Sequence, residues 1–191
     1  MKPNYFGIIY IALIGSIVAT LCDNVHSFTG CLIYPKPDLF GQPWYISIAF
    51  FFAFILMGIG YLLFDRYLPE TINRTYSISK GNINSFVEAL MLFAFIYLMS
   101  GFGHEYPNVL GIIFYSTYVL RLALSKDKSF ILIVSLTVAF MGSWVENSHF
   151  GPNSGSYSHK DFLNLPNWLP ALYLHGAFAL REGMRLFVYR N

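Results

Sequence analysis

The sequence predicts an all-α membrane protein, a single domain over residues 1–191 with six transmembrane helices and both ends on the cytoplasmic side. The composition, the long apolar runs and the distribution of basic residues each support this prediction. Hydrophobic residues make up 55% of the 191 residues and charged residues only 12%. A soluble domain carries about a quarter charged residues. The mean hydropathy of +0.51 is likewise typical of a chain embedded in lipid.

Six apolar runs are the candidate spans. A bilayer core about 30 Å thick needs roughly 20 apolar helical residues to cross it. These runs must be helical because lipid offers no partner for unpaired backbone groups, and a closed barrel would show alternating polarity instead. The last run is apolar only to Leu180, so its second half is expected to be amphipathic or to emerge into the headgroups. The expected spans are 5–22, 44–64, 86–103, 109–124, 130–146 and 168–188.

The first run follows Lys2 and could be mistaken for a signal peptide. The stretch Ala19-Thr20-Leu21-Cys22 lacks small residues at both positions that a signal peptidase reads. We therefore expect this run to be retained as the first transmembrane helix.

The basic residues predict the orientation. Positive residues collect in the cytoplasmic segments of membrane proteins. Six spans place the N-terminus, residues 65–85, residues 121–129 and the C-terminus on one side, and leave only Lys36 and Lys160 on the other. The first side is therefore predicted to be cytoplasmic. Its ten basic residues are Lys2, Arg66, Arg74, Lys80, Arg121, Lys126, Lys128, Arg181, Arg185 and Arg190.

The opposite, outer side is expected to carry two long loops, residues 23–43 and 147–167, both rich in Pro and Gly. Trp44, Trp144 and Trp168 fall at span ends on this side, as in the aromatic belts of membrane proteins. No internal repeat is evident. The cysteines Cys22 and Cys31 could form a disulfide if they face an oxidising space, but we favour free thiols.

Histidines and carboxylates gather on the outer side. Glu146 and His149 are three residues apart and would share a helix face, with His104 and Glu105 in a nearby loop. Together these four residues could form an acid–base or metal-binding set. We favour the alternative, solvated loop residues and interfacial caps, because no pair repeats at the spacing of a known metal motif. No metal site and no cofactor are expected.

Polar residues inside the spans are candidate ligand contacts. His175 lies seven residues into the sixth span, where a polar group usually faces the bundle interior and often marks a pathway or ligand. Tyr97, Tyr115 and Tyr118 carry hydroxyl groups that need partners within the membrane. A neutral imidazole bonded to a neighbouring helix is the other explanation of His175, and we leave both open.

Two stretches of the sequence match the pattern of a known family. The stretch Ile59-Gly60-Tyr61-Leu62-Leu63-Phe64-Asp65-Arg66-Tyr67-Leu68-Pro69-Glu70 resembles the end of the second helix and the first cytosolic loop of the Insig (insulin-induced gene) family. The second stretch resembles the family's last loop and sixth helix, and the resemblance is colinear over roughly residues 44–187. Its matching residues are Gly155, Tyr157, Asp161, Phe162, Leu163, Trp168, Leu169, Pro170, Gly176 and Arg185.

The resemblance implies a fold and a function. Insig proteins have six helices with both termini cytosolic; they are not enzymes, bind oxysterols, and hold the escort protein Scap. Their bacterial relatives resemble binders of diacylglycerol in a central cavity. Asn108 stands where the family has a glutamine implicated in sterol binding. Arg121 stands near a family Trp, and Ser125 aligns with an Asp needed for Scap. These two departures favour a prokaryotic or divergent relative that binds lipid without Scap.

The function predicted from the sequence is binding of a sterol- or diacylglycerol-like membrane lipid, regulatory rather than catalytic. The alternative is a membrane-embedded enzyme acting on an isoprenoid or other lipid, an isomerase, cyclase or hydratase that uses Glu146, His149, His104 and Glu105. A transporter has little support, since a pore usually needs several buried charges or broken helices. The predicted ligand-binding residues are Asn108, Tyr115, Tyr97, His175 and Trp168.

The expected partners follow from the same prediction. They are a membrane lipid, a second membrane protein or a second copy of the chain. Nucleic acid is not expected as a partner, because the sequence has no Lys/Arg-rich patch. The expected location is the inner membrane of a prokaryote or the endoplasmic reticulum of a eukaryote.

Overall fold

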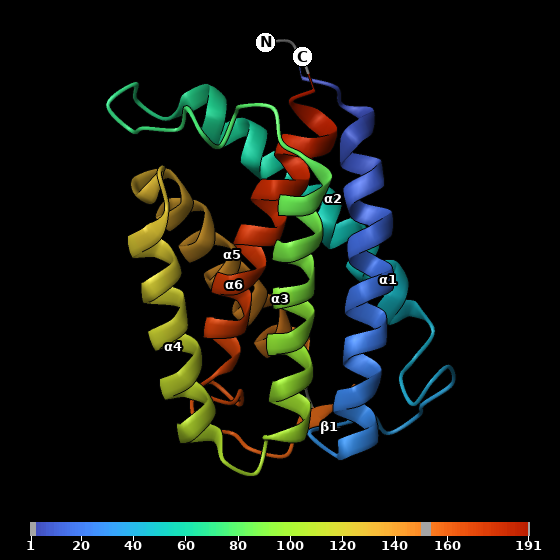
Figure 1. The fold of residues 1–191 in the computed structure, drawn as a ribbon. Coiled ribbons are helices and arrows are strands. Elements are labelled where there is room, and N and C mark those ends of the chain that lie inside the picture. The colour runs from blue at the N-terminus through green and yellow to red at the C-terminus, as the bar shows by residue number, and fades with distance from the viewer. Residues whose placement is uncertain (1–2, 150–153, 191) are drawn as a thin grey trace.

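The chain folds into an all-α bundle, seen here in a computed structural model that describes residues 3–149 and 154–190, apart from the side chain of His149. The described residues form six helices that run up and down the bundle (Figure 1). A turn of π-helix, η1, continues the sixth helix. The prediction of six helices is confirmed. Their bounds are α1 Phe6–Thr29, α2 Tyr45–Tyr67, α3 Ile83–Phe102, α4 Pro107–Leu124, α5 Lys128–His149, α6 Leu169–Gly183 and η1 Met184–Val188.

Five of these helices, α1 to α5, are long and apolar enough to cross a membrane. Helix α6 has only 15 residues before the π-helical turn, and nearly all of them are buried. In Figure 1 it runs through the middle of the bundle, so its side chains meet protein rather than lipid. Helix α2 is the opposite case, because its buried residues are only Ile46, Gly58 and Tyr61. The chain is therefore an integral membrane protein with one protein-enclosed helix.

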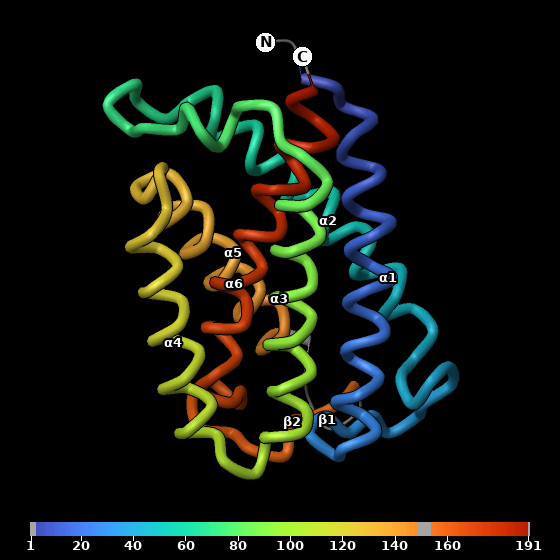
Figure 2. Tube along the Cα trace, viewed as in Figure 1, coloured from blue at the N-terminus to red at the C-terminus, as the bar shows by residue number. Residues whose placement is uncertain are grey.

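Both chain ends lie at one end of the bundle, here called the terminal face, as the prediction requires (Figures 1 and 2). The opposite end is called the far face. There β1, Leu32–Ile33, pairs antiparallel with β2, Ser156–Tyr157, with Leu32 opposite Tyr157. This small sheet joins the segment after α1 to the segment before α6. Lys2 and residues 150–153 lie outside the described part of the chain.

Helix α1 ends at Thr29, seven residues beyond the expected end at residue 22. The helix continues because no Gly or Pro interrupts it before Gly30. Gly30 adopts a left-handed conformation (φ 77°), and its N–H donates to the Ser27 carbonyl as a C-cap. Asp23 and His26, which we placed in an outer loop, are therefore helical and buried. The loop prediction was wrong for these residues.

The far face contains two tight turns of the same form. Leu39 bridges to Gln42, and Phe162 bridges to Leu165, each across two residues. Both central residues have positive φ in each turn, namely Phe40-Gly41 and Leu163-Asn164. This is the backbone of a type I′ hairpin turn. The matched turns shortly precede α2 and α6, so the chain has a local structural repeat that we did not identify in the sequence.

The charged end of α6 does not emerge into the headgroups, as we had expected. Arg181, Glu182 and Arg185 are buried, with 8%, 4% and 6% of their surfaces exposed. Arg181 pairs with Glu182 at 3.0 Å and with Asp127 at 2.8 Å, and Arg185 pairs with Glu182 at 2.5 Å. Because each charge has an opposite partner, the cluster can lie inside the protein.

Candidate functional site

An apolar pocket lies between α1, α2, α3 and α6. Gly15 and Gly176 leave room for two rings: an added Cβ would stand 3.0 Å from the Phe54 ring and 3.2 Å from the Phe93 ring, respectively. The cavity has a volume of about 20 Å³. The pocket is lined by Ile11, Ile14, Gly15, Val18, Phe54, Phe86, Leu90, Phe93, Gly176, Ala179 and Leu180.

This pocket is the counterpart of the central lipid-accessible cavity expected from the sequence, but it is small. A cavity needs about 10–15 Å³ on this measure to hold one water, so the pocket has room for about one water. A lipid chain therefore fits only if side chains move, and Phe54 belongs to the helix with the fewest buried residues.

A buried carboxylate lies about one helical turn from the pocket, toward the far face. Tyr97 follows Phe93 by four residues on α3, a rise of about 6 Å. Its hydroxyl donates to Oδ1 of Asp23 at 3.2 Å, and the hydroxyl of Tyr34 donates to Oδ2 at 3.0 Å. Nδ1 of His26 lies 3.8 Å from Oδ1 of Asp23. Three separate elements thus converge on one carboxylate.

A second carboxylate is held in the same way. Tyr157 of β2 donates its hydroxyl to Oε2 of Glu146 at 2.5 Å, and Tyr173 of α6 donates to Oε1. Burial and the charge of Glu146 keep the pKa of Tyr157 well above its ordinary value, so the hydroxyl stays protonated and remains a donor. We call Asp23, Glu146 and their four tyrosines the tyrosine–carboxylate cluster.

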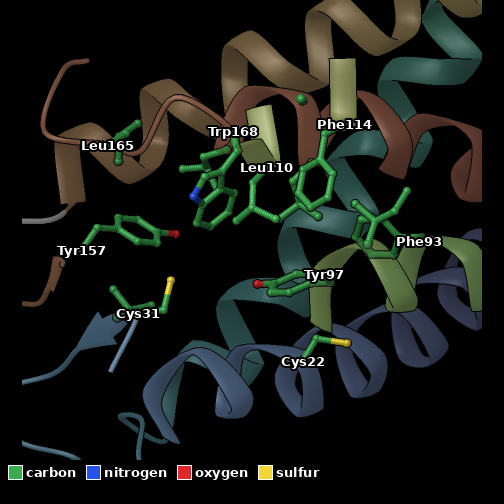
Figure 3. Close-up of a cluster of buried hydrophobic side chains, with 14 of the residues drawn as sticks. Cys22, Cys31, Phe93, Tyr97, Leu110, Phe114, Tyr157, Leu165 and Trp168 are labelled. Atoms are coloured by element: carbon green, nitrogen blue, oxygen red, sulfur yellow. The ribbon is translucent and has the colours of Figure 1, made fainter. Parts of the chain in front are cut away.

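Trp168 lies beside both halves of the tyrosine–carboxylate cluster. Its indole is fully buried and stands edge-on to His26, with 5.7 Å between ring centroids, and to Tyr157, at 6.1 Å. In Figure 3 the hydroxyl groups of Tyr97 and Tyr157 point toward one another, with Trp168 next to them. Nε1 of Trp168 and Nδ1 of His26 are buried and have no hydrogen-bond partner among the described residues. Both atoms lie beside the tyrosine–carboxylate cluster and outside the lining of the apolar pocket.

The five predicted ligand contacts separate into three places. Tyr97 and Trp168 belong to one buried cluster. Asn108 and Tyr115 are exposed and meet at Asn167: Nδ2 of Asn167 donates to Oδ1 of Asn108 at 2.7 Å, and the Tyr115 hydroxyl donates to the Asn167 carbonyl at 3.2 Å. The predicted residues therefore lie in three places, and Tyr97 and Trp168 share their buried cluster with Phe93 and Ala179, which line the pocket.

His175 lies in the third place, and both of its ring nitrogens have hydrogen-bond partners. Nη1 of Arg121 lies 2.9 Å from Nδ1 of His175. A guanidinium can only donate, so Nδ1 accepts and Nε2 carries the hydrogen. Nε2 then donates to the Phe114 carbonyl at 2.9 Å. This is the neutral imidazole bonded to a neighbouring helix that we considered as the other explanation.

The residues of the alternative catalytic set have separate partners. His104 contacts the Ser158 hydroxyl at 3.1 Å and the Thr29 carbonyl at 3.0 Å. Glu105 is exposed. Glu146 is held by the two tyrosines of the tyrosine–carboxylate cluster, and the side chain of His149 lies outside the described part of the chain. Among the residues that the structure describes, no group of His, Cys, Asp and Glu could hold a metal ion.

Five residues of the site were not identified in the sequence as ligand contacts: Asp23, His26, Tyr34, Tyr157 and Tyr173. Asp23 and His26 stand three apart, which is the spacing of one helix face. The uninterrupted run from Cys22 to Thr29 could have placed them on α1. Tyr157 and Tyr173 gave no such signal, since only the pairing of β2 and the path of α6 bring them to Glu146.

The comparisons with known proteins bear on the fold. No protein-family model matches the chain, and no curated protein matches it. Among solved structures, the chain is similar to the mycobacterial Insig homologue MvINS from Mycobacterium vanbaalenii, with a TM-score of 0.80 and 16% identity. That match covers 97% of this chain and 96% of MvINS.

A structure of a cross-linked trimer of an MvINS variant is also similar, with a TM-score of 0.77, 16% identity, and 96% and 95% of the two chains covered. At this identity the likeness concerns the path of the backbone and carries no information on individual side chains. It extends over almost the whole of both chains, so it includes every helix described above. The chain therefore has the fold of the Insig homologue MvINS, which confirms the resemblance found in the sequence.

Proposed function

We propose that this protein is an Insig-like, prokaryotic or divergent regulator that binds a membrane lipid with a small hydroxyl-bearing headgroup, such as a diacylglycerol or a sterol. The observation that carries the proposal is the position of the apolar pocket beside the tyrosine–carboxylate cluster. The acyl chains or ring system would enter the pocket after Phe54 moves. Burial of apolar surface would supply most of the binding energy, and a few polar groups would orient the ligand.

The headgroup would lie beside Trp168. Its Nε1–H is a hydrogen-bond donor without a partner among the described residues, and Nδ1 of His26 lies close by. A ligand hydroxyl can accept from the indole and donate to a carboxylate or to the imidazole. A phosphodiester would bring a negative charge next to Asp23 and Glu146, which disfavours phospholipids at this site.

The orientation is part of the proposal. The ten basic residues of the segments expected on the terminal side favour the cytoplasm for that side, and the tyrosine–carboxylate cluster would then lie near the opposite leaflet. The cross-linked trimer of the MvINS variant supports the expectation that this chain also forms homo-oligomers. Tags at the two ends should report the same side of the membrane in a protease-protection assay.

Native mass spectrometry of protein purified in mild detergent tests the binding function. The wild type should retain a neutral lipid in stoichiometric amount. Trp168→Phe keeps an aromatic ring but removes the indole N–H donor. It should lower the retained fraction of lipid about fivefold, which corresponds to the contribution of about 1 kcal/mol from one hydrogen bond. Trp144→Phe is the matched control, since Trp144 is 59% exposed. Retention of phospholipids only, in proportion to the membrane composition, would contradict the proposal.

A lipid-processing enzyme is the second candidate. The observation that favours it is Glu146, a carboxylate held by two hydroxyls close to the unpartnered Nε1 of Trp168, which is an arrangement suited to general acid–base chemistry. Glu146→Gln separates the two functions. An enzyme would lose its product from the lipid extract of expressing cells and accumulate its substrate. A binding protein would leave the lipid profile unchanged and lose only the lipid that co-purifies with it.

A further inference from the structure

The terminal face contains a polar groove with no role in the proposed function. The segment between α2 and α3 arches over this end of the bundle (Figure 1). Residues of this segment and Lys126, in the turn before α5, line the groove. Its volume is about 320 Å³, at the lower end of the range for small-molecule sites. No carboxylate is among the described residues that line it. The lining residues are Asn73, Thr75, Tyr76, Ser79 and Lys126.

Three cations converge on Tyr76. The Arg185 guanidinium lies 3.7 Å from the ring centroid, the Arg181 guanidinium 5.0 Å, and Nζ of Lys126 5.6 Å. Ser79 connects the arginines to the groove, because its hydroxyl accepts from Nη2 of Arg185 at 3.3 Å. Tyr76, which lines the groove, therefore lies among three positively charged groups.

The three cations are not equally neutralised. Arg181 and Arg185 pair with Asp127 and Glu182 inside the protein. Lys126 has no carboxylate partner among the described residues and is exposed at the rim of the groove. Nε of Arg185 is buried and has no hydrogen-bond partner in the described part of the chain. Together the three cations and their two carboxylate partners carry three positive and two negative charges. The positive charge without a carboxylate partner is that of Lys126, at the groove.

We propose that this groove binds a phosphate group, supplied by the headgroup of an anionic phospholipid in the leaflet at the terminal face. The Lys126 ammonium would provide the charge, while the hydroxyls of Thr75 and Tyr76 and the amide of Asn73 would provide donors around the phosphate oxygens. The Ser79 hydroxyl would not donate, because its hydrogen is engaged by the Tyr76 carbonyl at 2.7 Å. Basic pockets at the ends of transmembrane helices recognise anionic lipids by this chemistry. The site lies at the opposite end of the bundle from the tyrosine–carboxylate cluster, so the two ligands bind independently.

Native mass spectrometry with added lipid tests this site. Phosphatidylglycerol, phosphatidylcholine and inorganic phosphate are titrated separately against the wild type, Lys126→Glu and Lys80→Glu. Lys80 is the matched control, because it is an exposed lysine in the segment between α2 and α3 and does not line the groove. Lys126→Gln is added as a milder change in case charge reversal disturbs the fold beside Asp127.

The proposal predicts that the wild type prefers phosphatidylglycerol over phosphatidylcholine, and that Lys126→Gln weakens phosphatidylglycerol binding at least about fivefold, the effect of one basic residue near a membrane surface. Lys126→Glu should weaken it further, whereas Lys80→Glu should have a smaller effect than Lys126→Gln. Competition by inorganic phosphate at the same concentration as the lipid would show that the site takes a soluble phosphate, which overturns the assignment to a lipid. Equal losses in the Lys126 and Lys80 variants, or no preference for phosphatidylglycerol, would overturn the site itself.

Discussion

Tyr157 and Glu146 form a hydrogen bond of 2.5 Å that ties β2 to α5 at the far face. The bond joins a two-residue strand to a transmembrane helix, and Tyr173 brings α6 to the same carboxylate. The Glu146 side chain thus fixes three elements around Trp168. This arrangement makes the tyrosine–carboxylate cluster a structural support as well as the proposed headgroup site.

Tyr157→Phe should destabilise the protein by about 1.5–3 kcal/mol, the usual contribution of a hydrogen bond to a charged group. The loss should appear as a lower midpoint of thermal unfolding in detergent. Tyr106→Phe is the control, since Tyr106 is 67% exposed and should leave the midpoint within the experimental error. An unchanged midpoint for Tyr157→Phe would mean that the Glu146 bond contributes nothing to stability.

Phe54→Ala should increase the amount of neutral lipid that co-purifies with the protein. The Phe54 ring lies against Gly15 and reduces the apolar pocket, so its removal leaves space for an acyl chain. Phe52→Ala, on the exposed side of the same helix, removes the same number of atoms and should leave lipid retention at the wild-type level. Quantitative lipid extraction checks both variants, and equal retention by the two would place the ligand outside this pocket.

Arg181→Met should cost about 3–5 kcal/mol of stability, because it leaves Asp127 buried without a positive partner. Asp127→Leu combined with Arg181→Met should recover much of this loss, since no uncompensated charge then remains. Arg66→Met is the control: Arg66 is exposed and has no carboxylate partner among the described residues. Thermal unfolding in detergent distinguishes the variants, and a double variant no more stable than Arg181→Met would refute the pairing.

Gly7→Ala should destabilise the protein by about 1–3 kcal/mol, the cost of overpacking. A Cβ at this position would overlap the backbone carbonyl of Phe187, where α1 crosses η1. Gly60→Ala is the matched control, because a Cβ at Gly60 meets no atom within 4 Å. The control should be neutral or slightly stabilising, since alanine favours helix more than glycine does. Midpoints of thermal unfolding compare the two, and equal midpoints would contradict the close approach.

The sequence was most informative where one physical effect dominates. Apolar length and basic-residue asymmetry act over whole segments, so they predicted six helices and two chain ends on one face. The end of α1 was missed because Asp23 and His26 are polar, and polar residues were taken as leaving the membrane. Hydroxyl donors from Tyr34 and Tyr97 compensate Asp23, and those donors come from distant segments.

The candidate site was predicted only in part for the same reason. Tyr97 was identified from its position inside a span, and Trp168 from its position at a span end and its match to the Insig pattern, which are properties of the local sequence. Asn108 and His175 were placed near the ligand by resemblance and by depth, yet their partners are Asn167 and Arg121. Which side chains meet in a bundle depends on helix rotation, which neither apolar length nor charge counts report.

A structure of the protein purified without removal of lipid tests the central proposal most directly. We expect continuous, elongated density beside Phe93 and Gly176, with its polar end within hydrogen-bond distance of Nε1 of Trp168. Density confined to the outer surfaces of α2 and α4, with the Phe54 ring still closed over Gly15, would contradict the account.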